Sequence, residues 1–208
     1  MEKFIAGYRQ FRDTYFKENY GVIQDLMAKG QAPKAMMIAC SDSRIDPSLE
    51  FGVEPGEMFI VRNVANLVPA FDPDGHAHGT SAALEFAVRA LEVEHVIVMG
   101  HARCGGIRAL MNQPLMKKSE SNDFVAAWMK IAEPARVKAL QASSDPAVAQ
   151  RCCEQEAVRV SLDNLLTFPW VKEAADSGKL QIHGWYFDLE TATLSILNKK
   201  TGEFEIIR

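Results

Sequence analysis

The chain has 208 residues, of which 48% are hydrophobic and 24% are charged, and its formal net charge is -4. This length and composition suffice for one domain with a sizeable core. The acidic balance gives no basic surface of the kind that nucleic acids or anionic membranes select, and no apolar stretch reaches the roughly 18 residues of a membrane span. We therefore expect a single globular domain over residues 1–208, with neither nucleic acid nor a membrane as partner.

The cysteines and the N-terminal residues indicate the compartment. Residues 1–13 mix charged and apolar side chains instead of forming the apolar core of a signal peptide. The chain has only four cysteines, Cys40, Cys104, Cys152 and Cys153, which are too few for a disulfide scaffold of this size. We expect a cytosolic protein, whose reduced thiols are available for metal binding or catalysis.

The first predicted element is an amphipathic N-terminal helix. Its aromatic residues Phe4, Tyr8, Phe11 and Tyr15 recur at helical spacing on one face. Such a stripe indicates packing against a large surface. The surface is either the core of the chain itself or a partner subunit, on which the helix would lie as an arm.

Three apolar stretches predict the first strands of a sheet, at residues 34–39, 58–61 and 95–99. Small and apolar residues at helical spacing predict a helix over 79–91, and strand–helix–strand order implies a right-handed parallel crossover. Lys117 and Lys118 are typical of a solvated loop.

The C-terminal third adds a long helix and two strands. Asp145 followed by Pro146 is typical of a helix start, and this helix is expected to run towards Leu166. Residues 180–189 and 193–198 read as closing strands. The predicted fold class is α/β, with a mostly parallel central sheet flanked by helices and an N-terminal helical arm.

Reactive side chains follow two of the predicted strands. Cys40, Asp42 and Arg44 lie in the sequence ACSDSR after the first strand, and His101 and Cys104 lie in GHARCGG after the third. Functional groups gather at the carboxyl ends of strands in open α/β sheets. We therefore expect one shared site, and the alternation of an extended chain predicts that Cys40, Asp42 and Arg44 lie on one side.

The residue types indicate zinc. Zinc takes thiolate and imidazole ligands, and catalytic zinc sites keep three protein ligands and one open position. Cys40, His101 and Cys104 are three such ligands, and amides at the start of a helix after Gly105 would favour the thiolate of Cys104. The alternative is that each cysteine is a small buried apolar residue, which the combined pattern disfavours.

The segments CSDSR, RNVAN and GHARCGGI resemble the β-class carbonic anhydrases, and the similarity runs from about residue 31 to residue 197. The KGQ segment is most similar to the plant-type branch. The resemblance implies the reversible hydration of carbon dioxide to bicarbonate and a proton. It also implies one zinc ion per subunit, held by Cys40, His101 and Cys104.

Asp42 and Arg44 fit a catalytic pair. Asp42 can accept the hydrogen of the attacking hydroxide, and Arg44 can hold Asp42 through a charge-assisted pair. Released from Arg44, Asp42 could fill the fourth zinc position in a closed state. The other interpretation is an ion pair without a catalytic task.

The resemblance also implies a substrate pocket. Phe59, Val64 and Phe86 would form its apolar wall, while Gln31 supplies an amide and Gly105 a backbone N–H. The family commonly has tyrosine at the position of Phe86, so a hydroxyl is missing there. Because two subunits line this pocket in the family, a homodimer or a higher homo-oligomer is implied.

Alternatives of two other kinds remain open from the sequence. One is a hydrolase of carbonyl sulfide or carbon disulfide on the same scaffold, and the other is a non-catalytic zinc protein that senses bicarbonate. The family branch that bicarbonate can close uses a tryptophan, an arginine and a tyrosine where this chain has Met37, Arg62 and Phe187. We therefore predict an open site without cooperative inhibition by bicarbonate.

Overall fold

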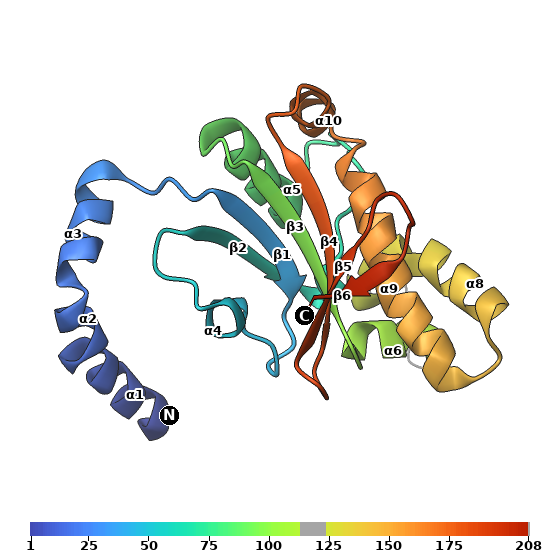
Figure 1. Ribbon diagram of the computed structural model, residues 1–208, viewed down its shortest axis with the longest axis horizontal. Helices are drawn as coiled ribbons and strands as arrows, with labels where there is room; N and C mark the ends of the chain where they lie inside the picture. The colour runs from blue at the N-terminus through green and yellow to red at the C-terminus, as the bar shows by residue number, and fades with distance from the viewer. Residues whose placement is uncertain (113–123, 208) are drawn as a thin grey trace.

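A computed structural model describes residues 1–112 and 124–207, so Lys117 and Lys118 lie outside the described residues. Its centre is a six-stranded sheet in the order β2-β1-β3-β4-β5-β6 (Figure 1). The strands are β1 (Ala35–Cys40), β2 (Met58–Asn63), β3 (His95–His101), β4 (Gln181–Asp188), β5 (Thr193–Leu197) and β6 (Phe204–Ile206).

The sheet is mixed but mostly parallel, as predicted. The pairs formed by β1 with β2, β1 with β3 and β3 with β4 are parallel, whereas β5 and β6 run antiparallel to their neighbours. The first three strands extend further than the apolar stretches predicted, so Cys40 and His101 are the last residues of β1 and β3. The short edge strand β6 was not predicted, because three residues carry too little periodicity to be recognised.

Helices surround the sheet. The longest is α9 (Pro146–Leu165), which begins as predicted, because the Asp145 carboxylate accepts the backbone N–H groups of its first turn. The other helices outside the N-terminal segment are α4 (Pro47–Phe51), α5 (Gly79–Glu85), α6 (Gly105–Asn112), α7 (Phe124–Met129), α8 (Glu133–Ala142) and α10 (Pro169–Asp176). Short 3-10 turns lie at Val64–Asn66 and Lys130–Ala132.

The helix predicted over 79–91 is not a continuous α-helix. It changes after α5 into a π-helical turn, Phe86–Ala90, closed by the bond from the Leu91 N–H to the Phe86 carbonyl. A π-turn has the same apolar spacing as an α-helix over so few residues, so periodicity could not reveal it.

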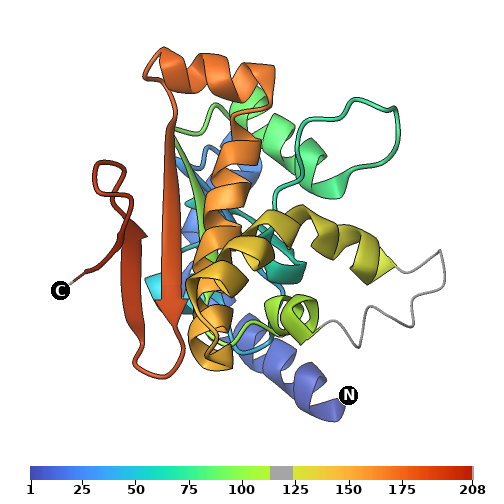
Figure 2. The ribbon, with the colours of Figure 1, turned by 90° about the vertical axis from the view of Figure 1, so that its right-hand side faces the viewer.

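The two faces of the sheet are buried against different partners. Alternate residues of β1 and β3, such as Ile38 and Val98, pack with Val158 of α9, which runs along this face (Figure 2). The intervening residues, such as Met37, pack on the opposite face with Trp185 and neighbouring side chains. A further cluster that contains Cys40 and Cys104 lies between the sheet, α6, α8 and α9.

The N-terminal segment is different from the rest of the chain. It consists of α1 (Glu2–Asp13), α2 (Tyr15–Glu18) and α3 (Tyr20–Lys29), contains no buried residue and extends away from the sheet (Figure 1). Phe4, Tyr8 and Phe11 are 73%, 61% and 46% exposed. These three residues therefore do not pack on the core of their own chain, whereas Tyr15 is half-buried and its hydroxyl donates to Glu54. Across the described ranges, no helix has both the length and the hydropathy to cross a membrane.

Candidate metal centre

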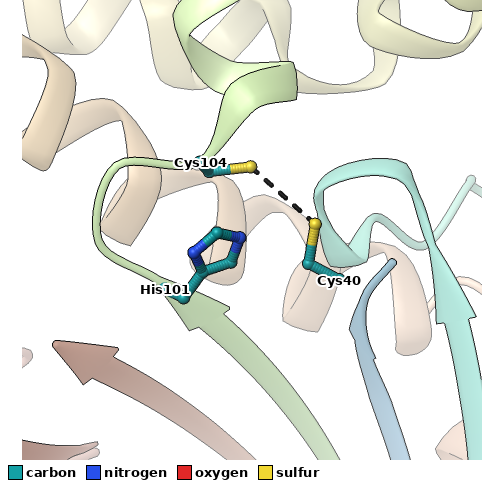
Figure 3. Close-up of side chains that lie close together, drawn as sticks. All are labelled: Cys40, His101 and Cys104. Carbon is teal, nitrogen blue, oxygen red and sulfur yellow. Dashed lines mark hydrogen bonds between the residues drawn. The ribbon is translucent and has the colours of Figure 1, made fainter. Parts of the chain in front are cut away.

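Three side chains from distant parts of the sequence meet at the carboxyl edge of the sheet. They are Cys40 at the end of β1, His101 at the end of β3 and Cys104 directly before α6 (Figure 3). All three are buried, and one donor atom of each lies within 4.8 Å of the others. The convergence predicted from the strand ends is thus present in the structure.

The backbone explains how Cys104 reaches this position. β1 and β3 are adjacent and parallel, which brings their last residues side by side. Beyond His101 the chain reverses through Arg103, whose φ of 58° lies in the left-handed region. The Ala102 N–H donates to the Phe187 carbonyl and holds the start of this reversal against β4.

The imidazole of His101 presents an unprotonated Nε2 that suits metal binding. Its Nδ1 lies 2.9 Å from the Ala102 carbonyl oxygen, which requires a proton on Nδ1. Its Nε2 is buried and has no hydrogen-bond partner among the residues that the structure describes. A buried lone pair without a donor is costly, and a metal ion at this atom would satisfy it.

The two thiols also fit zinc. Their Sγ atoms are 4.0 Å apart, close to the roughly 3.8 Å edge of a tetrahedron with Zn–S bonds of about 2.3 Å. A hydrogen bond from Cys104 lowers the pKa of Cys40. The same contact, together with burial, raises the pKa of Cys104. The protein groups alone therefore stabilise one thiolate, and the charge of a dication is needed to ionise both.

The backbone amides at the start of α6 favour the thiolate of Cys104, as the sequence predicts, but other effects on its pKa are larger. The backbone N–H groups of Gly106 and Ile107 lower the pKa of Cys104, whereas the contact with Cys40 and burial have a larger effect in the opposite direction. Gly106 also allows α6 to start close to the sheet, because a Cβ there would lie 3.0 Å from the Val64 Cγ1.

Asp42 and Arg44 form a bidentate pair next to the three donors. Arg44 donates from Nε to Asp42 Oδ1 at 2.9 Å and from a terminal nitrogen to Oδ2 at 2.7 Å. These bonds hold the pKa of the Asp42 carboxyl well below its usual range. The same Arg44 nitrogen donates to the Arg103 carbonyl at 3.0 Å. This bond connects the pair to residues 102–104 between β3 and α6, hereafter called the Cys104 loop.

The reason predicted for the position of Asp42 and Arg44 is wrong. The chain does not stay extended after Cys40 but turns, and the Asp42 carboxylate accepts the Arg44 backbone N–H at 3.1 Å. The Ile45 N–H closes the turn on the Asp42 carbonyl. An aspartate that caps its own turn is a common local alternative to strand continuation.

Two supporting residues were not assigned these roles from the sequence. Arg62 donates to the carbonyls of Cys40, Asp42 and Ile45 at 3.0, 2.8 and 2.6 Å, and thereby holds the whole turn. Glu154 of α9 is buried and accepts the Cys104 N–H at 3.0 Å. Nothing in local periodicity signals either contact, although a charged residue on the buried side of α9 is itself unusual.

The structure brings some of the predicted pocket residues together. The rings of Phe59 and Phe86 lie 5.9 Å apart, and Phe86 is 48% exposed. The Val64 carbonyl accepts a hydrogen bond from Trp128 at 2.7 Å. Gly105 is the exposed first residue of α6. Gln31 is exposed, and its side chain has no hydrogen-bond partner within residues 1–112 and 124–207.

The fold and the three donors define an α/β protein with a candidate metal centre of two cysteines and one histidine at the carboxyl edge of its sheet. The family model for carbonic anhydrase matches residues 35–194. Beta carbonic anhydrase 3 of Arabidopsis thaliana is 37% identical over 198 residues, which are 94% of this chain and 76% of that protein.

Solved structures agree. The β-carbonic anhydrase CcaA superposes with a TM-score of 0.92 at 29% identity and covers 100% of this chain and 92% of its own. A tetrameric β-carbonic anhydrase from Sordaria macrospora has a TM-score of 0.79 at 27% identity, with coverage of 95% and 96%. The chain belongs to the β-carbonic anhydrase family.

Its cofactor is zinc, and its reaction is the reversible hydration of carbon dioxide to bicarbonate and a proton. Neither of the other functions that the sequence left open is favoured, because the matched family and these relatives are carbonic anhydrases. The donor set of Cys40, His101 and Cys104 agrees with this cofactor.

Proposed function

We propose that Asp42 and Arg44 are the catalytic pair of this carbonic anhydrase, and that one zinc ion per chain is bound by Cys40, His101 and Cys104. When bound, zinc lowers the pKa of a water molecule from about 15.7 towards 7. The observation that carries the proposal is the bidentate Asp42–Arg44 pair beside the three donors.

The role of Asp42 follows from its charge. Because Arg44 keeps the Asp42 pKa low, Asp42 stays ionised near neutral pH and can only accept hydrogen bonds. It therefore accepts the hydrogen of the reacting water and directs the oxygen lone pair at carbon dioxide. Arg44 is the positioning residue, since it holds both carboxylate oxygens of Asp42 and is itself held by the Arg103 carbonyl.

Carbon dioxide is small and apolar, so it requires a dry wall beside the reacting oxygen. We propose Phe59, Val64 and Phe86 for this wall, supported by the contact between the two phenylalanine rings. The Gly105 N–H and the Gln31 amide are the proposed donors to bicarbonate. Their exposed positions leave both available for a ligand.

We further propose a homodimer, as the unit of any higher oligomer, in which the aromatic stripe of the N-terminal helices packs on the partner subunit. The exposure of Phe4, Tyr8 and Phe11 supports this, because such apolar surface is rarely left in water. The absence of a side-chain partner for Gln31 within its own described chain fits a pocket completed by a second subunit. The Sordaria macrospora relative is tetrameric.

Two further proposals concern the chain as a whole. We propose that residues 1–208 form one domain, since a single sheet takes strands from residue 35 to residue 206. We also propose a cytosolic location, in agreement with the four free cysteines.

The test of the catalytic pair is the isosteric variant Asp42→Asn, measured by stopped-flow hydration of carbon dioxide with zinc content on the same sample. We expect full zinc and a rate lower by about 100-fold or more, because the amide can donate where only an acceptor works. Asp176→Asn, at an exposed ion-paired aspartate outside the site, is the control and should keep the wild-type rate. A wild-type rate for Asp42→Asn would refute the assigned role.

A further inference from the structure

α6, the first turns of α9 and the β4–β5 turn lie near one another at one edge of the molecule (Figure 1). Residues of these elements, of β4 and of the loop before α6 line a hollow. It is a half-open groove of about 460 Å³. The charged and aromatic side chains that line it are Arg103, Arg108, Arg151, Glu154, Tyr186 and Glu190. Hereafter it is called the arginine groove.

The arginine groove is separated from the three donors by the Cys104 loop. Ala102 and Arg103 line it from one side, whereas His101 and Cys104 present their donor atoms to the metal centre. The floor is Glu154, which accepts the Cys104 backbone N–H from the groove side. None of Cys40, His101 and Cys104 lines the groove, so a ligand there would not contact the three donors directly.

Both carboxylate oxygens of Glu154 already accept hydrogen bonds from the protein itself. One Glu154 oxygen accepts from the Cys104 N–H at 3.0 Å and from Gln150 at 2.9 Å, and the other accepts from the Tyr186 hydroxyl at 2.8 Å. Glu154 and Tyr186 are both buried. The charges that a solute meets are therefore mainly those of the rim.

Positive charge is in excess at the rim, where Arg103, Arg108 and Arg151 stand against one exposed carboxylate, Glu190. Arg103 and Arg151 have side chains that are 67% and 54% exposed, although they pair with Glu190 and Asp188. Arg108 is exposed and has no ion-pair or hydrogen-bond partner for its side chain in the part of the chain that the structure describes. An unpaired guanidinium in the same groove as two partly exposed ones attracts an anion.

One of these guanidinium groups is also held in place. Arg151 lies over the Tyr186 ring, with its central carbon 5.4 Å from the ring centroid, and donates to Asp188 at 3.0 Å. Two such contacts reduce the side-chain freedom that Arg151 would lose when it binds a ligand. The groove therefore combines one positioned guanidinium with one that lacks a partner.

We propose that the arginine groove binds a small oxyanion of the phosphate or polycarboxylate class, with Arg108 and Arg151 as its principal contacts and Arg103 at the rim. Guanidinium groups recognise phosphate and carboxylate oxygens through paired N–H donors, for which apolar ligands have no acceptors. A volume of about 460 Å³ accommodates an anion as large as citrate. This site is distinct from the metal centre and takes no part in the chemistry proposed for Asp42.

The test is isothermal titration calorimetry of the zinc-loaded full chain with two probes, inorganic phosphate and citrate. At least one probe should bind to the wild type, and the probe that binds distinguishes the two ligand sources. Arg108→Gln and Arg151→Gln should each weaken binding by about tenfold or more. Arg89→Gln, at another exposed arginine, is the control and should bind as the wild type does.

The same variants distinguish groove binding from anion binding at the metal centre, because Arg108 and Arg151 line the groove and the three donor residues do not. Zinc content and thermal stability measured on each variant show that the fold is retained. The proposal is overturned if neither probe binds to the wild type, or if both groove variants bind with wild-type affinity. Weaker binding in either variant, with wild-type zinc content, supports it.

Discussion

The metal centre and the N-terminal helices are opposite extremes of the same chain. Every donor of the candidate metal centre is buried. Arg62 of β2 holds the turn after Cys40, and Arg44 and Glu154 hold the backbone at Arg103 and Cys104. α1, α2 and α3 bury no residue at all. The difference shows that the chain arranges the donors of its candidate metal centre through its own contacts, whereas the aromatic side chains of its first helix stay largely exposed.

The largest effect on the metal centre is expected from the removal of one of its three donor side chains. His101→Ala or Cys104→Ser should abolish zinc binding and reduce carbon dioxide hydration to background, because three ligands are the minimum for such a site. Metal analysis and stopped-flow hydration on one sample measure both effects. Cys152→Ser, at a half-buried thiol outside the centre, should leave both unchanged. Stoichiometric zinc at full rate in a donor variant would contradict the ligand set.

Removing the Arg44 side chain tests whether Arg44 positions Asp42, and it leaves the three zinc donors in place. Arg44→Ala should retain zinc but lower the hydration rate by roughly 10- to 100-fold, because Asp42 loses both side-chain contacts that orient it. Arg89→Ala is a matched change at an exposed, ion-paired arginine. An unaltered rate in Arg44→Ala would dispose of its positioning role.

Glu154 tests whether support from α9 matters to the centre. Glu154→Gln should weaken zinc affinity by about tenfold, since an amide cannot accept from all of the Cys104, Gln150 and Tyr186 donors. The readout is zinc retention against a chelator of known affinity. Glu156→Gln, two residues further along the same helix, is the control. Equal zinc affinity in wild type and Glu154→Gln would show that the metal ion alone organises Cys104.

Deleting residues 1–16 tests the role of the N-terminal helices. The truncated chain should keep its zinc, because no residue of the deleted segment contributes to the core. Its dimer should dissociate at concentrations roughly tenfold higher than the full chain does, and hydration should decline with dissociation. Light scattering coupled to size exclusion measures the first effect. A fully active truncated monomer would refute both the arm and the shared pocket.

The smallest expected effect is the response to bicarbonate. Met37 is buried and Phe187 is half-buried, and both belong to the apolar cluster that contains Trp185. The Arg62 guanidinium already donates to three backbone carbonyls. None of them is available to hold a second bicarbonate, so inhibition should be hyperbolic and not sigmoidal. Initial rates over a range of bicarbonate concentrations near pH ~7.5, where a zinc-bound water with a pKa near 7 is mostly ionised, decide this. A steep sigmoidal loss would show a closable site.

The sequence alone determined the parallel strands, the capped start of α9 and the strand-end positions of Cys40 and His101. Each of these depends on a local pattern, such as an apolar stretch, a capping aspartate or a reactive residue at a fixed distance from a strand. The predicted zinc donors followed because adjacent parallel strands must end at the same edge.

Only the tertiary structure decided which residues support that site. The Arg62 contacts to three carbonyls, the Glu154 bond to the Cys104 N–H and the turn that pairs Asp42 with Arg44 leave no periodic trace in the sequence. The arginine groove likewise joins α6, α9 and the β4–β5 turn across many intervening residues. Such contacts depend on where whole elements pack, and the energy of packing is set by all the residues of the core together and not by the local segment.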